Sequence, residues 1–297
     1  MLSKLRFLLF YYLGWLAFFE CMRLCFVLYH VDKSAGIPFS EISGSFWYGL
    51  RMDLSVAAYI LVPVCLFVIL SLLIRFFQRP LVYRIYTSVI LLIVLLICLS
   101  DLEMYNAWGF RIDAGPLRFL STPREVMASI AHLPLCWIFL VFIIVYTLFY
   151  LAFRWLLKRT FFALQQNRRW ITGFVLLLVT GSLILPIRGG WQLAPLNQSA
   201  VYFSQHQFAN HAAVNASWNL LHSVFSKANV KKNPYLYFSA EESKKRVDSL
   251  YASNGSTEHW IAASDSTPVN VVIVILGEFH FQSSWAASQW RRNNTAI

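Results

Sequence analysis

The residue best placed to do chemistry is a single carboxylate, Glu278, near the C-terminus. It follows an apolar run, residues 269–276, that is rich in β-branched side chains and shows no alternation. Such a run is typical of a strand buried on both faces of a parallel sheet. Ligands bind beyond the carboxyl ends of strands in open α/β sheets, and carboxylate oxygens suit hard divalent cations. Glu278 is therefore our candidate metal ligand, although a surface Glu that closes a strand fits the spacing equally well.

A second group of chemically interesting residues is ionisable and lies inside or beside apolar runs. Glu20 and Arg23 are three residues apart, so they can pair on one helix face. Arg51 and Asp53 open the next apolar run. Intramembrane charges are functional candidates by default. Because most of these lie close to an interface and have an opposite charge nearby, a structural role is favoured here.

The chain that must position these residues has the composition of a membrane protein. Of 297 residues, 58% are hydrophobic and only 13% are charged. The net charge of +11 does not indicate nucleic acid, because much of the basic charge flanks apolar runs. No cysteine follows Cys136, so we expect no disulfide framework or cysteine metal site in the C-terminal part.

Five apolar runs reach or approach the ~20 residues that a bilayer core requires: 5–29, 49–74, 82–100, 133–153 and 170–187. The flanking basic residues are unequally divided, which sets orientation. We expect a multi-pass membrane protein, with its N-terminus inside and its C-terminus outside. The inner set is Lys4, Arg6, Arg75, Arg79, Arg84, Arg154, Lys158, Arg159, Arg168 and Arg169, and the outer set is Lys33, Arg51, Arg111, Arg118 and Arg124.

Several segments outside the runs also have recognisable patterns. The charged, turn-rich loop 101–132 could hold a lipid headgroup, dock an outer domain or be a solvated connector. Residues 197–225 predict a short amphipathic helix, with Trp218, Leu221 and Phe225 on one face, lying on the membrane or under an outer domain. Ser239 and Glu242 predict a capped helix start. We interpret the histidines of this region as surface residues rather than metal ligands; they are His206, His211 and His222.

Several short motifs, in this order and spacing, resemble the lipoteichoic acid synthase-like family of membrane enzymes. That family includes phosphoglycerol transferases and belongs to the alkaline phosphatase/sulfatase superfamily. The resemblance also implies that the protein lies in the bacterial cytoplasmic (inner) membrane. The motifs are Gly49-Leu50-Arg51-Met52-Asp53-Leu54-Ser55, Asp101-Leu102-Glu103, Trp108-Gly109-Phe110-Arg111-Ile112-Asp113, Arg188-Gly189-Gly190 and the strand with Glu278. The Gly277-Glu278 pair is more similar to the related phosphoethanolamine transferases.

The resemblance implies a mainly α fold with a defined domain order. A five-helix transmembrane domain (1–188) would be followed by extracytoplasmic juxtamembrane helices and a linker (189–267). Residues 268–297 would begin an α/β, alkaline-phosphatase-like domain. The implied activity is transfer of a headgroup from a phosphatidylglycerol-type lipid to an extracytoplasmic glycan or lipid acceptor, through a Thr nucleophile and a divalent metal (Mn or Mg, possibly Zn). Glu278 would be the first metal-binding Glu.

The segment after Glu278 departs from the family pattern. The resemblance takes the Thr nucleophile and the remaining metal ligands from farther downstream, and Thr295 lies too close to Glu278 to serve. A one-base shift in the reading frame would restore family-like residues here. We therefore expect a chain truncated near the start of the catalytic domain, inactive alone and binding metal poorly, with no catalytic or cofactor-binding residue of its own.

Two alternatives to the phosphoglycerol-type transferase stay open. One is a phosphoethanolamine transferase. The other is a non-catalytic membrane protein that binds lipid or a partner. A channel or transporter is less favoured, because the runs show neither repeated halves nor paired broken segments.

Overall fold

The computed structural model describes residues 1–117, 124, 134–161, 169–192, 194–228 and 237–251. Across these residues the chain is mainly helical and contains no strand. The predicted strand 269–276, Glu278 and the predicted α/β segment 268–297 lie outside the described residues. The chain divides into two compact units, Met1–Asn233 and Pro234–Ile297.

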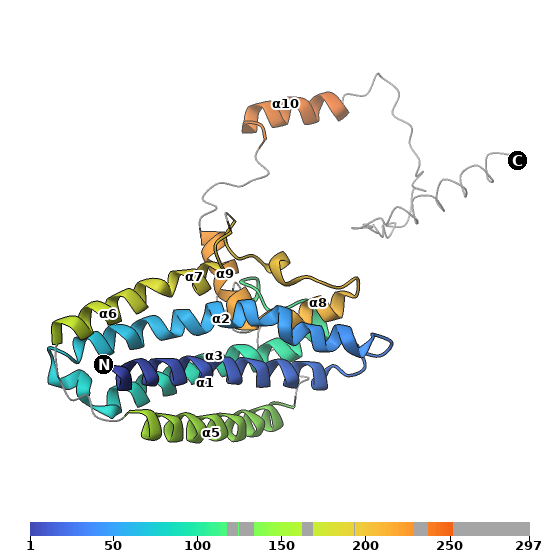
Figure 1. Ribbon diagram of the computed structural model, residues 1–297. Helices are drawn as coiled ribbons and strands as arrows, with labels where there is room; N and C mark the ends of the chain where they lie inside the picture. Colours follow the sequence, from blue (N-terminus) through green and yellow to red (C-terminus); the bar gives the residue numbers. More distant parts are fainter. Residues whose placement is uncertain (118–123, 125–133, 162–168, 193, 229–236, 252–297) are drawn as a thin grey trace, which may run out of the picture. The chain divides into compact units, whose positions relative to one another are not determined.

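Five helices of the first unit are long and apolar enough to cross a membrane, which confirms the prediction of five spans (Figure 1). Four are continuous: α1 (Leu2–Tyr29), α2 (Phe39–Leu70), α3 (Pro80–Trp108) and α5 (Leu135–Thr160). The fifth span comprises α6 (Arg169–Ser182) and the short α7 (Ile184–Arg188). A 3-10 turn, η1 (Arg75–Gln78), connects α2 to α3.

Several helices extend beyond the predicted apolar runs, and in α2 and α3 packing explains the extension. Helix α2 begins at Phe39 rather than at residue 49, and Ser45 within the added turns is buried. Helix α3 continues to Trp108, and its added turns bury Asp101 and Tyr105. It ends at Gly109, whose φ of 71° is left-handed, a conformation that glycine adopts without the cost of a Cβ.

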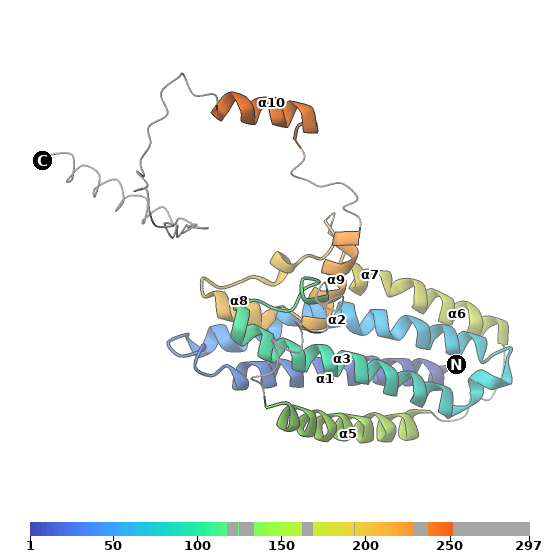
Figure 2. The ribbon, with the colours of Figure 1, turned by 180° about the vertical axis from the view of Figure 1, so that it is seen from behind.

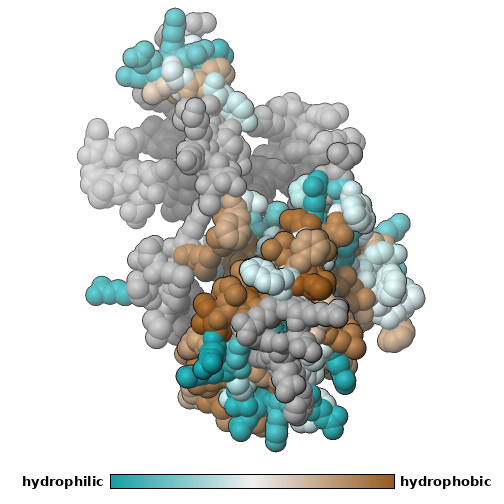
Figure 3. Space-filling view, turned by 60° about the vertical axis from the view of Figure 1, so that its left-hand side comes forward, coloured by the Kyte–Doolittle hydropathy of each residue, from teal (hydrophilic) through white to brown (hydrophobic). Residues whose placement is uncertain are grey.

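The spans form a bundle in which α1, α2 and α3 lie between α6 on one side and α5 on the other, as Figures 1 and 2 show from opposite directions. Aromatic residues fill the interior: Tyr11 and Trp15 are fully buried, and the ring of Trp15 lies 4.8 Å from that of Phe153. Much of the bundle's outer surface is hydrophobic, including Leu148 and Phe174 (Figure 3). An apolar exterior of this kind suits contact with lipid.

Three short elements follow the fifth span: η3 (Gln198–Val201), α8 (Gln207–Ala213) and α9 (Ala216–Ala228). Helices α8 and α9 pack against α2, and they also contact α1 and α3, respectively. They lie toward the end of the bundle away from the N-terminus (Figures 1 and 2). In the second unit, α10 (Ala240–Tyr251) begins as predicted, because the backbone N–H of Glu242 donates to Ser239 Oγ at 3.2 Å.

The helix near residue 218 is packed into the bundle and does not lie on its surface as predicted. Trp218 is buried and its indole N–H donates to Ser55 Oγ at 3.2 Å. Leu221 and Phe225, which were expected on the same apolar face, are exposed. The first turns of α9 are therefore inserted against α2, and the helix turns a different face to the protein from the one predicted.

Candidate functional site

The centre of the candidate site is a buried ion pair between two spans. Arg23 Nη2 of α1 lies 2.8 Å from Asp53 Oδ2 of α2, with 3% and 0% of the two side chains exposed. Arg23 Nη1 also lies 3.3 Å from Glu20 Oε1, which confirms the predicted pairing along α1. Taking charges out of water is costly unless they are paired and hydrogen-bonded, so the remaining partners of this pair matter.

Those partners come from α8 and α9. Arg23 Nε donates to the carbonyl oxygen of Ala212 at 3.1 Å, at the last turn of α8. Carbonyl groups at a helix C-terminus lack intrahelical partners, and a cation there is favoured. Asn215 Nδ2 donates to Asp53 Oδ1 at 2.7 Å, and Asn215 Oδ1 accepts from the N–H of Trp218 at 3.0 Å. Asn215 thus caps the start of α9 and ties that helix to the ion pair.

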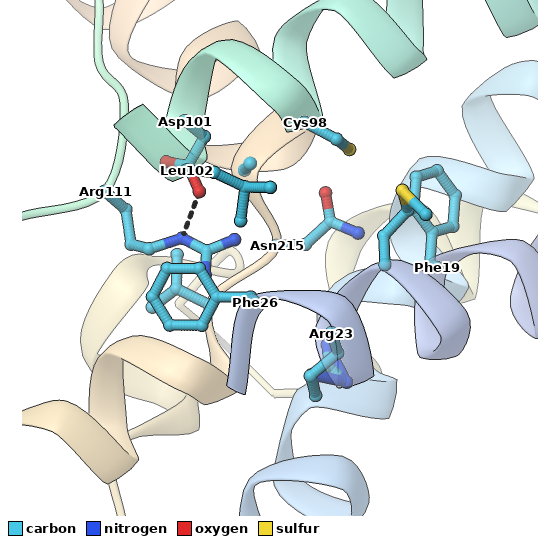
Figure 4. A pocket seen from close by; sticks show the side chains of 11 residues that line it. Phe19, Arg23, Phe26, Cys98, Asp101, Leu102, Arg111 and Asn215 are labelled. Atoms are coloured by element: carbon cyan, nitrogen blue, oxygen red, sulfur yellow. Dashed lines mark ion pairs between the residues drawn. The ribbon is translucent and has the colours of Figure 1, made fainter. Parts of the chain in front are cut away.

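A second buried ion pair holds the segment after α3. Arg111 Nε lies 3.1 Å from Asp101 Oδ2, and Asp101 Oδ1 accepts from the backbone N–H of Ile112 at 2.7 Å. The Arg111 guanidinium lies over the Phe26 ring, 3.9 Å from its centre (Figure 4). These charged residues of the predicted loop are thus buried and paired, not solvated. Asn219 Nδ2 of α9 also donates to the carbonyl oxygen of Ile112, at 2.9 Å.

A small cavity separates the two ion pairs. Arg23, Asp101, Arg111 and Asn215 contribute to its walls, together with Cys98 and several apolar side chains (Figure 4). Its volume is about 20 Å³, which is room for about one water molecule. The cavity is therefore too small for a substrate, and the paired side chains form a packed interior rather than an open active site.

Next to the second ion pair lies a buried histidine. His211 Nδ1 of α8 lies 3.1 Å from the Tyr105 hydroxyl. Burial lowers the pKa of His211, and the positive charge of Arg111 lowers it further. Burial also lowers the pKa of Arg111, while Asp101 opposes that shift. His211 is thus a neutral hydrogen-bonding partner within the assembly.

The Arg188-Gly189-Gly190 motif packs on helix α2. Arg51 Nε donates to the carbonyl oxygen of Gly189 at 3.0 Å, and Ser55 Oγ donates to that of Ile187 at 2.9 Å. Gly189 has a φ of 85° and lies so close to Leu196 that a Cβ would be 2.9 Å from it. Both the left-handed φ and the close contact with Leu196 require a glycine at this position. Two motif segments, 49–55 and 188–190, therefore meet at α2.

The structure corrects one interpretation of the histidines and leaves the metal prediction open. His206 and His222 are exposed, as predicted, but His211 is buried. The described residues contain no group of three or more His, Cys, Asp or Glu side chains that could hold a metal ion. Glu278, the predicted ligand, lies outside them.

Sequence reasoning missed the partners that complete the site. Tyr105, Asn215 and Asn219 are buried or half-buried polar residues whose hydrogen bonds span distant segments. The one available signal was local, because Asn215 precedes a helical pattern at a position where an N-cap is favoured. In the part of the chain that the structure describes, the fold and site define a helical protein with five helices suited to a membrane and with the segment after the fifth docked into the bundle. Comparisons with protein-family models, curated proteins and solved structures found no match to this chain.

Proposed function

We propose that this chain is the membrane-embedded part of a metal-dependent transferase. The enzyme would move the headgroup of a phosphatidylglycerol-type lipid onto an extracytoplasmic glycan or lipid acceptor. The observation that carries the proposal is the convergence of motif residues on one another and on the docked segment: Asn215 binds Asp53 of α2, and Asn219 binds Ile112 of the segment after α3. Asp53 pairs with Arg23, Asp101 pairs with Arg111, and Arg51 binds the Arg188-Gly189-Gly190 turn.

This convergence suits a domain that positions an enzyme beside its lipid substrate. Residues 207–220 are held on α1, α2 and α3 by buried side chains, so the chain that follows them starts from a fixed point on the bundle. Holding a catalytic group close to its substrate removes part of the entropic cost of their encounter. A transferase that acts on membrane lipids would benefit from a catalytic segment anchored to the bundle in this way.

In this proposal the metal belongs with Glu278. The carboxylates of the buried cluster already face arginines, so they are poorly suited to binding a further cation. A carboxylate ligand such as Glu278 fits Mn or Mg, and Zn is also compatible with oxygen ligands. When bound, the metal would lower the pKa of the nucleophile and stabilise charge on the transferred phosphoryl group.

A non-catalytic protein that binds lipid or a partner is the second candidate. The buried ion pairs and the small cavity favour it, because both are features of a packed structural core. A phosphoethanolamine transferase differs from the first candidate only in the headgroup moved. One assay with two labelled lipids separates all three.

The test captures the product of the gene through an N-terminal tag and assays it in proteoliposomes. Together with the catalytic segment that this proposal requires, we expect transfer of labelled glycerol phosphate from phosphatidylglycerol, its loss on chelation of divalent metal, and its recovery with Mn. Glu278→Gln should abolish transfer, whereas Glu258→Gln, a matched change at the preceding part of the chain, should not. Transfer from phosphatidylethanolamine alone would indicate the related activity. Absent transfer from both lipids would support the non-catalytic candidate, and metal-independent transfer would contradict the metal-dependent mechanism.

A further inference from the structure

The end of the bundle that holds the N-terminus carries positive charge without any acidic partner in the segments that form it. The sequence has no Asp or Glu before Glu20, none between Asp53 and Asp101, and none between Glu125 and Glu241. The start of α1, the end of α2, η1, the start of α3, the end of α5 and the start of α6 all fall in those intervals. Figure 3, which brings this end forward, shows hydrophilic side chains projecting around the hydrophobic surface.

Two of these cations share one site. Arg84 of α3 and Arg154 of α5 line the same small cavity between their helices, together with the hydroxyl residues Thr87, Ser88 and Tyr150. The apolar floor of the cavity includes Leu91 and Leu157. Like charges on neighbouring helices repel, and here no carboxylate of the surrounding segments offsets them.

The local hydrogen bonding leaves Arg84 able to accept a ligand. Its Nε is buried and has no hydrogen-bond partner among the described residues. Ser88 Oγ, by contrast, is engaged with the Tyr146 hydroxyl at 2.5 Å, and Thr87 Oγ1 donates to the carbonyl oxygen of Tyr83 at 2.7 Å. Ser88 and Thr87 are therefore already hydrogen-bonded, whereas Arg84 Nε is a donor without a partner among the described residues.

The helix ends add to the preference for an anion. Arg84 lies in the second turn of α3, whose N-cap, Arg79, makes no side-chain capping hydrogen bond. The N-terminus of a helix favours negative charge and disfavours positive charge. With basic residues and no carboxylate there, an external anion would offset both the charge repulsion and the helix dipole.

The cavity has a volume of about 10 Å³, which is room for about one oxygen atom of a ligand. We propose that Arg84 and Arg154 bind the phosphate of an anionic phospholipid in the leaflet at this end of the bundle, with one phosphate oxygen in the cavity and the rest of the headgroup outside it. Basic pockets between transmembrane helices are suited to lipid headgroups, and guanidinium groups bind phosphate through charge-assisted hydrogen bonds. The exposed apolar side chains of α3 and α5 on the mid-span side of the site, including Val89 and Leu151, would contact the acyl chains. The site is separate from the ion pairs around Arg23 and does not depend on the proposed transferase activity.

The experiment measures lipid retention by native mass spectrometry of the whole chain released from nanodiscs. The discs contain phosphatidylcholine with a small fraction of phosphatidic acid, which supplies a phosphate without any further headgroup. We expect selective retention of phosphatidic acid, weakened about fivefold by Arg84→Gln or by Arg154→Gln, since one basic residue near anionic lipid contributes roughly 1 kcal/mol. Arg84→Lys, which keeps the charge, should retain more lipid than Arg84→Gln.

The matched control is Arg159→Gln. Arg159 lies at the same end of α5, over the Trp155 ring, and does not line the cavity. Its replacement by Gln changes the net charge by the same amount as the other two Gln substitutions. Equal losses in all three Gln variants would overturn the proposal in favour of diffuse positive charge. Equal retention of phosphatidic acid and phosphatidylcholine would also overturn it, and displacement of the lipid by inorganic phosphate would assign the site to a free ion. Circular dichroism of each variant confirms that it is folded.

Discussion

Arg23 of α1 and Asp53 of α2 form an ion pair of 2.8 Å, and the same guanidinium binds the carbonyl oxygen of Ala212 at the end of α8. One side chain therefore joins two spans to a segment that is remote in sequence. Its charge is balanced by Asp53 and Glu20. Packing of the spans and docking of α8 are thus expected to fail together when this residue is changed.

Arg23→Gln is expected to lower the stability of the bundle strongly. Removing one partner of a buried pair leaves the other charge unpaired, at a cost of about 3–5 kcal/mol. Thermal unfolding in detergent micelles measures this effect. The control is Arg246→Gln, which breaks the exposed pair with Glu242 and should cost no more than about 0.5 kcal/mol. Similar losses in both variants would contradict the assigned role of Arg23.

Asp101 and Arg111 are expected to act as a unit. Asp101→Asn and Arg111→Gln each leave one buried partner behind, so each single change should be costly and the double change should cost less than their sum. A coupling free energy of about 0.5–3 kcal/mol is typical of contacting residues. Additive losses in the double-mutant cycle would mean that the two side chains do not pair in the folded protein.

His211 is expected to make the docked segment sensitive to acid. Its pKa in the folded protein is lowered by burial and by Arg111, whereas an exposed histidine titrates near pH ~6.5. Below that pH the unfolded chain binds the extra proton more readily, so the stabilising contribution is complete above pH ~6.5 and declines as the pH falls. The groups next to the ring include Tyr105 and Tyr202.

The measurement is the melting temperature of wild type and His211→Gln between about pH 8 and about pH 5.5. Wild type should lose more stability on acidification than His211→Gln. His222→Gln is the control, because His222 is exposed and stacks on Trp218, and it should follow the wild-type profile. Parallel profiles for wild type and His211→Gln would contradict the assignment.

The five spans were predictable because they depend only on length and apolar content. The sequence also predicted the Glu20–Arg23 pair, since residues three apart on a helix are neighbours. It could not predict that Asp53 pairs with Arg23 rather than with a residue of its own helix. That contact joins residues 30 apart in the chain and depends on the packing of α1 against α2.

The docking of residues 207–220 was missed for a related reason. This segment reads as polar, yet Asn210, His211, Asn215 and Asn219 are buried. Asn210 bonds to the backbone of residues 203 and 204. The other three bond to partners on α2, α3 and the segment after α3, so burial does not require apolar residues here. A hydrophobic pattern alone therefore placed the apolar face of α9 incorrectly.

Gly49→Ala tests how closely α1 approaches α2. A Cβ at Gly49 would overlap the guanidinium of Arg23, which is held by Asp53 and cannot move freely. We expect a loss of about 1–3 kcal/mol from overpacking. Gly181→Ala is the control: it lies within α6 and a Cβ there meets nothing within 4 Å, so it should be neutral or slightly stabilising. A neutral Gly49→Ala would contradict the close approach.

The predicted orientation is testable by cysteine labelling in intact cells. Lys158→Cys and Ser226→Cys, in a chain freed of its five native cysteines, place thiols at exposed positions of α5 and α9. With the N-terminus inside, a membrane-impermeant maleimide should label only the cysteine at position 226. Labelling only at position 158 would reverse the orientation.

The most direct test of the docking is amide hydrogen exchange of the whole chain in nanodiscs, compared between residues 207–220 and α10. We expect the 207–220 amides to exchange slowly, because the segment is buried against three spans, and to become faster in Arg23→Gln. The exposed helix α10 provides the internal reference for rapid exchange. Exchange of residues 207–220 as fast as that of α10 in the wild-type chain would contradict the account.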